Sequence, residues 1–373
     1  MSLVVDGARL ADPGPDDPTV DASELTVLPG FIDVHTHGGG GFGLHTLDPD
    51  EIRCYAAWAP STGCTAFLAG VVGIPAGLPL DELSAAAGAA GEPGPGAEIL
   101  GIHLEGPFLN PSRRGAHDPS WLRMPSREAA LRMIDAARGW LRIVTLAPEL
   151  PNADAAMAAF VAAGVVVSIG HTDATYDETN AAIGRGARHA THCFNAMPPL
   201  LHRAPGPLGA VADASDVLGE LIADGVHVQP PAMRALLRLL GVNRTVIVTD
   251  AQSGAGLDDP VMMFAGMPAR VSGGVARLAD GTIAGSVLTM DRALRNAVAM
   301  LGATLPEASA MLTANPARAA GAAGRKGLLA PGYDADLVVL DADLAPVATY
   351  CRGQLAFAAT RWLDRLRAAG VEP

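Results

Sequence analysis

Short apolar and β-branched runs recur along the chain, and alanine-rich segments separate them. Eight of these runs predict strands, at residues 31–35, 64–69, 99–105, 141–146, 165–171, 187–192, 218–224 and 245–250. Runs that are apolar at nearly every position are typical of strands buried on both faces of a parallel sheet. The repeat therefore predicts an α/β fold, a closed (β/α)₈ barrel of the TIM type, whose active site lies at the carboxyl ends of the strands.

The segments between the runs have the apolar spacing of helices that pack on a sheet. We expect helices at residues 127–137, 153–163 and 231–240. After the fifth run, Thr175 and Glu178 have the spacing of a capping box, which starts a helix by satisfying its first backbone N–H groups. Helices in these places complete the βα units of the barrel.

The two ends of the chain follow a different pattern. Residues 1–28 and 327–356 combine β-like runs with Gly-containing turns, and residues 335–340 (ADLVVL) predict a strand. Neither end could bury one face of a sheet alone, so we expect both termini to form one small β-sandwich domain. Residues 29–326 would then form the catalytic barrel, and residues 357–373 a C-terminal helix and tail.

Composition narrows the class of protein. The 373 residues are 49 % apolar and 17 % charged, with a net charge of −13, which predicts a large core and excludes extensive disorder. The acidic chain has no basic run, so we expect no nucleic-acid partner. It also has no signal-peptide pattern and no uninterrupted apolar span, so we expect no membrane association. Its four cysteines form no CxxC pair, which favours a reduced, cytoplasmic protein.

The basic residues are unusually uneven in type. All but one of the 26 are arginine, and the single lysine is Lys326. Schiff-base chemistry, a P-loop lysine and a metal-bridging carbamylated lysine are therefore excluded from the first 325 residues.

Side chains able to bind a metal stand where the predicted strands end. They are His35 and His37 after the first run, Glu105 after the third, His171 after the fifth, His192 after the sixth and Asp250 after the eighth. Neutral imidazole and carboxylate are the usual ligands of Zn²⁺ or Fe²⁺. The pattern predicts a divalent-metal site at the barrel mouth. His45 and His189 lack this placement and are expected to be ordinary hydrogen-bonded histidines, and His103 at most supports a ligand.

Several blocks of sequence resemble the N-acetylglucosamine-6-phosphate deacetylases of the amidohydrolase superfamily. They are LPGFIDVHTHGGGG, GIHLEGPFLNPSRRGAHDP, GHTDATYDE, ATHCFNAM, IADGVHV, VTDA and AGSVLTM, in family order. The blocks HLEGPF with GAH, and THCFNAM, are the specific ones, whereas HxH marks only the superfamily.

The resemblance implies roles for the residues at the predicted metal site. Glu105, His171 and His192 match the family's principal metal ligands, and Asp250 its catalytic aspartate, which serves as general base and then general acid toward a metal-activated water. His35 and His37 match positions that hold a second ion in some members. The resemblance thus implies one or two divalent ions, Zn²⁺ or Fe²⁺, with Glu105 spanning them when both are bound.

The same resemblance implies how a phosphorylated N-acetyl amino sugar would bind. His117 matches the histidine that polarises the acetamide carbonyl. Asn195, Ala196 and His227 match substrate-binding positions, the first two at the phosphate. Arg203 matches an arginine that reaches the phosphate from the neighbouring subunit, which implies a homodimer.

Other functions stay open at this stage. The substrate of the N-acetylgalactosamine-6-phosphate enzymes differs only in the orientation of one hydroxyl group. No motif in the chain indicates which of the two orientations would be bound. The missing lysine disfavours a cyclic-amide hydrolase of the same superfamily, and the CFNAM and GAH blocks disfavour both that activity and a deaminase. A non-catalytic sugar-phosphate binding protein would be expected to lose Asp250 or a metal ligand, and all of them are present.

Overall fold

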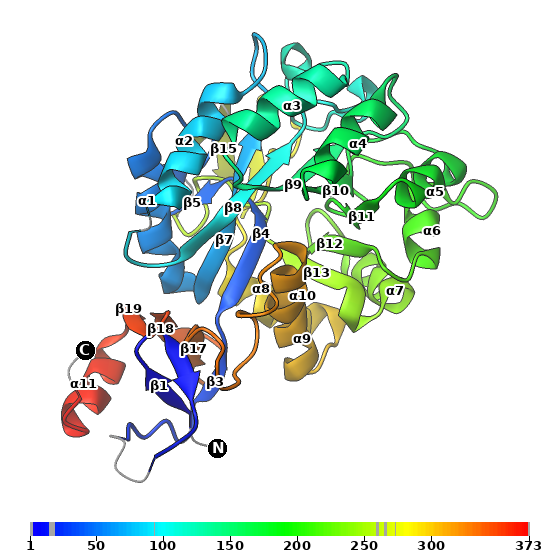
Figure 1. The fold of residues 1–373 in the computed structure, drawn as a ribbon. Coiled ribbons are helices and arrows are strands. Elements are labelled where there is room, and N and C mark those ends of the chain that lie inside the picture. The colour runs from blue at the N-terminus through cyan, green and yellow to red at the C-terminus, as the bar shows by residue number, and fades with distance from the viewer. Residues whose placement is uncertain are drawn as a thin grey trace.

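Eight parallel strands form the central sheet of the computed structural model, which describes residues 3–14, 19–92, 94–258, 261–264, 267–272 and 274–371 (Figure 1). In order across the sheet they are β4 (Phe31–Thr36), β7 (Cys64–Val72), β8 (Glu98–Glu105), β9 (Leu141–Leu146), β10 (Val166–Ile169), β11 (Ala187–Ala190), β12 (Leu218–Ile222) and β13 (Thr245–Val248). This order follows the chain, so each strand pairs with the next along the sequence. The predicted α/β barrel is confirmed.

The sheet closes where its last strand meets its first. The Asp250 backbone N–H donates to the His35 carbonyl at 2.8 Å, and the His37 N–H donates to the Ala251 carbonyl at 2.7 Å. Next to these bonds, the Thr249 hydroxyl donates to the buried carboxylate of Asp33 at 2.6 Å. These contacts bring the ends of β4 and β13 together although more than two hundred residues separate them in the sequence.

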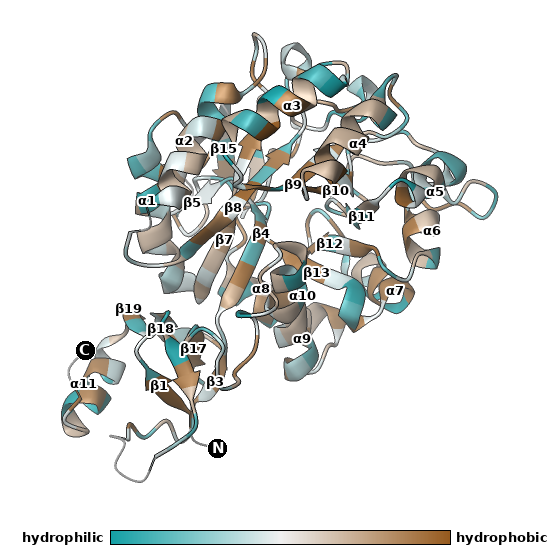
Figure 2. Ribbon diagram, viewed as in Figure 1, coloured by the Kyte–Doolittle hydropathy of each residue, from teal (hydrophilic) through white to brown (hydrophobic). Residues whose placement is uncertain are grey.

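Helices surround the strands, as Figure 1 shows for α2, α3, α4 and α7. Their bounds are α1 (Pro49–Trp58), α2 (Leu80–Gly91), α3 (Arg127–Ala136), α4 (Ala153–Ala162), α5 (Tyr176–Gly184), α6 (Gly206–Asp213), α7 (Pro230–Leu240), α8 (Met290–Asn296), α9 (Leu305–Leu312) and α10 (Ala314–Ala319). The three helices predicted from the sequence are present as α3, α4 and α7. The predicted capping box at Thr175 is also present and starts α5. Brown, hydrophobic residues dominate β7 and β8 in Figure 2, whereas teal residues lie on the outer helices. No helix in the described ranges has both the length and the apolar character needed to cross a bilayer.

Both termini contribute to a second group of strands beside the barrel (Figure 1). A four-stranded antiparallel sheet has the order β19 (Gln354–Ala358), β18 (Pro346–Cys351), β17 (Leu337–Leu340) and β3 (Thr26–Pro29). The hairpin of β1 (Val4–Asp6) and β2 (Arg9–Ala11) and the last helix, α11 (Thr360–Ala368), lie beside it. Leu10, Val339 and Trp362 belong to the shared apolar cluster. Residues 1–2, 15–18, 372 and 373 of the predicted terminal segments lie outside the described residues.

Two features differ from the sequence prediction. Four of the predicted strands end two residues early, at Ile169, Ala190, Ile222 and Val248. In addition, an unpredicted antiparallel sheet of β14 (Val261–Phe264), β15 (Met267–Ser272) and β16 (Val275–Arg277) stands between β13 and α8, next to the barrel mouth. The small hairpin of β5 (Gly38–Gly39) and β6 (Phe42–Gly43) also follows β4.

The single lysine joins the terminal sheet to the base of the barrel. The Lys326 ammonium group, fully buried, contacts the carboxylates of Glu98 at 2.9 Å, Asp334 at 3.0 Å and Asp336. Glu98 begins β8, while the two aspartates precede β17. Burial opposes the charge of Lys326, but the carboxylates outweigh this effect and raise the pKa of the lysine. Arg325 also contacts Glu98 and Asp334, so Asp336 depends most on the lysine.

We predict that Lys326→Met destabilises the fold by about 3–5 kcal/mol, because it leaves a carboxylate buried without its cation. Lys326→Arg keeps the charge and should cost less. Arg367→Met removes an exposed pair with Asp364 and should change stability by no more than about 1 kcal/mol. Urea unfolding followed by circular dichroism measures all three variants. A Lys326→Met protein as stable as the Arg367→Met protein would contradict the assigned role.

Candidate metal centre and active site

The six predicted metal-binding side chains meet at the carboxyl end of the barrel. His35 and His37 lie at the end of β4, Glu105 is the last residue of β8, and the others follow β10, β11 and β13. All six are buried, with exposed fractions of 9 % or less, and they are His35, His37, Glu105, His171, His192 and Asp250. Strand ends that are distant in sequence thus place six polar groups in one small volume.

Left-handed turns direct three of these side chains. His171, His192 and Asp250 each stand two residues after a strand and have positive φ angles of 49°, 26° and 47°. This backbone conformation is uncommon for residues other than glycine, and it is retained chiefly where function constrains the chain. The same turns end the strands earlier than the apolar pattern predicts.

The Glu105 carboxylate lies between four imidazoles. Its Oε1 is 3.0 Å from Nε2 of His171 and 3.1 Å from Nε2 of His192. Its Oε2 is 3.2 Å from Nε2 of His37 and 3.4 Å from Nε2 of His117. The two Nε2 atoms of His171 and His192 lie 3.0 Å apart. Each carboxylate oxygen of Glu105 therefore faces two of these imidazole nitrogens.

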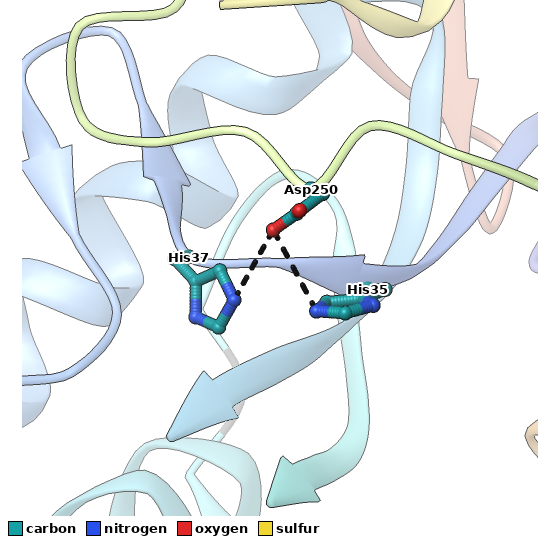
Figure 3. A group of neighbouring side chains, drawn as sticks. All are labelled: His35, His37 and Asp250. Atoms are coloured by element: carbon teal, nitrogen blue, oxygen red, sulfur yellow. Dashed lines mark ion pairs between the residues drawn. The ribbon is translucent and has the colours of Figure 1, made fainter. Parts of the chain in front are cut away.

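Asp250 faces the two histidines of the HxH motif. Figure 3 shows the aspartate reaching from the loop after β13 toward both rings, and its Oδ1 lies 3.4 Å from His37 Nε2 and 3.6 Å from His35 Nε2. His35 Nε2 is buried and has no hydrogen-bond partner among the described residues. It also lies 3.6 Å from Glu105 Oε1. This nitrogen points into the group of carboxylates without bonding to any of them.

The two buried carboxylates of the cluster, Glu105 and Asp250, are stabilised in their ionised form by positive charge on the neighbouring histidines. Burial opposes ionisation of Glu105, but His35 and the contacts with the imidazoles of His117, His171 and His192 outweigh it and hold the pKa of Glu105 well below its usual range. Burial also opposes ionisation of Asp250, yet His35 and His37 lower its pKa to about 2. In turn the two carboxylates overcome burial and raise the pKa of His37 to about 9. A proton on His37 occupies the place of a cation, so binding of a metal would compete with protonation.

These residues fit a divalent ion. The donors are imidazole nitrogens and carboxylate oxygens, which suit Zn²⁺ and Fe²⁺. Burial lowers the pKa of His171 to about 4, which leaves its imidazole neutral, as a ligand must be. Two ligand atoms that bind one tetrahedral zinc ion at ~2.0–2.2 Å lie about 3.3–3.6 Å apart. The contacts described above span 3.0–3.6 Å. His35, His37 and Asp250 form one compact group of possible ligands, and Glu105, His117 and His171 form another.

The predicted substrate residues surround this centre to different extents. His117 is buried at the Glu105 carboxylate, and its backbone carbonyl accepts a hydrogen bond from Arg114 at 2.7 Å. Asn195 lies in the turn after His192 and donates to the His192 carbonyl at 3.1 Å, and Ala196 follows it with a positive φ of 51°.

The other two predicted substrate residues lie in the loops after β12 and β11. His227 follows β12 and its Nδ1 contacts Asp224 at 2.6 Å. Arg203 stands apart from these residues, exposed on the loop between β11 and α6.

Three histidines that were not predicted to be ligands are hydrogen-bonded. His103 contacts the Val34 carbonyl and the Thr145 hydroxyl, each at 2.8 Å. His189 contacts the Ser168 hydroxyl at 3.2 Å, and His45 accepts from the Val72 N–H at 3.3 Å. None of these four contacts is to one of the six predicted ligands.

Sequence analysis missed Glu220. This residue of β12 is fully buried behind the histidines, and its Oε2 lies 2.7 Å from Nδ1 of His35. The only signal was a charged residue inside an otherwise apolar run, LGELI. On its own, that signal does not indicate which side of the strand the carboxylate faces.

Comparisons with known proteins agree with this arrangement. The model of the amidohydrolase family matches residues 26–360. An N-acetylglucosamine-6-phosphate deacetylase from Bacillus subtilis is 36 % identical over 90 % of this chain and 85 % of its own length. An N-acetylgalactosamine-6-phosphate deacetylase from Escherichia coli O157:H7 is 37 % identical over 95 % of this chain and 93 % of its own.

Solved structures give the same result. A mutant N-acetyl-D-glucosamine-6-phosphate deacetylase from Mycobacterium smegmatis, in complex with N-acetyl-D-glucosamine-6-phosphate, superposes with a TM-score of 0.88 at 41 % identity, covering 95 % of this chain and 94 % of that one. The enzyme from Pasteurella multocida gives a TM-score of 0.89 at 31 % identity, covering 96 % and 94 %. The chain therefore belongs to the amidohydrolase family, in the branch that contains the N-acetylglucosamine-6-phosphate deacetylases.

Proposed function

We propose that the protein hydrolyses the acetamide of N-acetyl-D-glucosamine 6-phosphate to D-glucosamine 6-phosphate and acetate, with one or two divalent ions, Zn²⁺ or alternatively Fe²⁺. The observation that carries this proposal is the Glu105 carboxylate, whose Oε1 lies between His171 and His192 and whose Oε2 lies between His37 and His117. The named activities of the relatives support the substrate. The principal ion would be held by Glu105, His171 and His192, and a second one by His35, His37 and Asp250 with Glu105.

The protein's own groups carry the proton transfers of the reaction. A bound divalent ion supplies a water whose pKa is lowered from ~15.7 to about 7. Asp250, ionised and facing the centre, accepts the proton of the attacking water at its carboxylate and then gives it to the departing amine. His117 donates a hydrogen bond to the acetamide oxygen as negative charge develops there. One such donor is typically worth ~10²–10³ in rate.

The phosphate would bind away from the reacting amide. Asn195, through its side chain, and Ala196, through its backbone N–H, would contact it from the turn after His192. Arg203 of a second copy would add a bidentate contact, since the planar guanidinium group binds two phosphate oxygens at once. This arrangement makes the enzyme a homodimer in which each subunit completes the site of the other.

The two candidate substrates, N-acetylglucosamine 6-phosphate and N-acetylgalactosamine 6-phosphate, differ only in whether one hydroxyl group is equatorial or axial. Curated relatives named for the glucosamine and the galactosamine epimers match this chain at 36 % and 37 % identity, and these two values do not separate the epimers. The glucosamine epimer is supported by the Mycobacterium smegmatis structure, which has the higher identity of 41 %. We propose a cytoplasmic setting, because all four cysteines are unpaired and the substrate is a phosphorylated metabolite.

Metal removal tests the proposed function most simply. We expect dialysis against a chelator to abolish acetate release from N-acetylglucosamine 6-phosphate, and stoichiometric Zn²⁺ or Fe²⁺ to restore it. Elemental analysis before and after gives the number of ions per chain, and the galactosamine epimer is assayed alongside. Full turnover by metal-free protein would reject the mechanism, and faster turnover of the galactosamine epimer would transfer the proposal to that substrate.

Asp250→Asn should lower kcat by ~10²–10⁴, the range for loss of a general acid–base group. The ion held by Glu105, His171 and His192 should remain bound, which elemental analysis checks. Asp216→Asn, which alters an exposed pair with Arg188, is the control and should leave kcat unchanged. Near-normal turnover by Asp250→Asn would remove this residue from the proton transfers.

Arg203→Ala should raise KM for the phosphorylated sugar and leave kcat nearly unchanged. Mixing tests whether the arginine acts between subunits. When Arg203→Ala and Asp250→Asn proteins are unfolded together and refolded, mixed dimers contain one site with both residues intact. Activity of the mixture above the sum of the two separate proteins is expected. Activity equal to that sum, with mixed dimers present by native mass spectrometry, would place Arg203 in its own subunit's site or outside any site.

A further inference from the structure

A glutamate without exposed surface lies directly behind the candidate metal centre. Glu220 stands in the middle of β12, and one oxygen of its carboxylate, Oε2, makes two contacts. It lies 2.7 Å from Nδ1 of His35 and accepts a hydrogen bond from the backbone N–H of His192 at 3.0 Å. His35 faces Asp250, and His192 faces Glu105. Glu220 therefore contacts both parts of the centre from the side away from the mouth.

This contact determines which nitrogen of His35 carries a proton. Oε2 of Glu220 accepts a hydrogen bond from the backbone N–H of His192 at 3.0 Å, so it is also the acceptor toward Nδ1 of His35, 2.7 Å away. Nδ1 of His35 therefore carries the proton of this hydrogen bond. Nε2 is then the nitrogen that can present a lone pair, and it is the atom that faces Asp250 and Glu105, 3.6 Å from each.

We propose that Glu220 is a positioning residue of the metal centre, which fixes the tautomer and ring orientation of His35 and anchors the turn that carries His192. The inference rests on the proposed metal-dependent function. A carboxylate behind a metal-binding imidazole orients the ring and raises its basicity, and such partners typically change metal affinity by 10–100-fold. Glu220 contacts no predicted substrate residue, so it acts through the two histidines.

A role in packing alone does not explain the carboxylate. Glu220 Oε1 is buried and has no hydrogen-bond partner among the described residues, and the nearest imidazole nitrogen, Nδ1 of His189, lies 3.5 Å away. An incompletely bonded buried carboxylate lowers stability compared with an apolar side chain of similar volume. Retaining a charge at this position is expected where the charge serves the histidines in front of it.

Two substitutions separate the charge from the hydrogen bonds. Glu220→Gln keeps an oxygen that can accept from both His35 and His192 but removes the negative charge, whereas Glu220→Leu removes both. Thr145→Val is a matched control. The buried Thr145 hydroxyl contacts His103 and Thr191, and neither of these residues is one of the six predicted ligands. Zinc affinity is measured by competition with a chromogenic chelator, together with the number of ions per chain.

The Glu220→Leu protein is expected to bind Zn²⁺ 10–100-fold more weakly than the wild type, and Glu220→Gln more weakly by a smaller factor. The loss should concern the ion that is also lost in His35→Ala, so that Glu220→Leu adds little to the His35→Ala defect. Thr145→Val should bind as the wild type does. If the Glu220→Leu protein does not fold, the Glu220→Gln protein alone tests the inference. It is expected to bind Zn²⁺ more weakly than the wild type while its thermal stability is unchanged.

Other results would overturn the inference. Wild-type zinc affinity in a folded Glu220→Leu or Glu220→Gln protein would make Glu220 a packing residue, and so would an equal loss in Thr145→Val. Additive losses in the Glu220→Leu, His35→Ala double variant would also reject action through His35. A wild-type protein that binds no Zn²⁺ or Fe²⁺ would instead overturn the proposed function, and this inference with it.

Discussion

The contact on which the site depends is that between the Glu105 carboxylate and the imidazoles around it. Four Nε2 atoms, from four separate segments of the chain, lie within 3.4 Å of its two oxygens. A buried carboxylate is strongly unfavourable unless positive charge and hydrogen bonds compensate for it. Asp250 is also buried nearby, so two carboxylates bring negative charge to the barrel mouth. Protonated histidines such as His37 compensate for this charge when no ion is bound, and a divalent cation would compensate for both carboxylates at once.

The rest of the fold brings these segments together. Sequential pairing of the eight strands places the ends of β8, β10 and β11 beside one another, and closure of the sheet between β13 and β4 adds Asp250 to the HxH motif. Strained turns at His171, His192 and Asp250 turn the chain sharply at the ends of three strands. At the opposite end, the buried charges around Lys326 connect β8 to the sheet formed by both termini. The network at one end therefore stabilises the strand that carries Glu105 at the other.

Much of this arrangement could be predicted from the sequence, for a simple reason. Parallel strands buried on both faces leave a strong apolar pattern, and a polar residue at the end of such a run can only face the mouth. His35, Glu105 and His171 were found in this way. Glu220 was not, because a lone charge inside an apolar run does not show what lies across the barrel from it. The sheet of β14, β15 and β16 was also missed, because its strands are only three to six residues long.

Anomalous diffraction from crystals of the metal-loaded protein tests the central claim most directly. Data collected at the zinc or iron edge locate the bound ion independently of its effect on activity. The account predicts an anomalous peak between Glu105 Oε1 and the Nε2 atoms of His171 and His192, with any second peak between Asp250 and the histidines of the HxH motif. A stoichiometrically loaded crystal whose anomalous peak lies elsewhere, with Glu105 bonded only to protonated histidines, would contradict it.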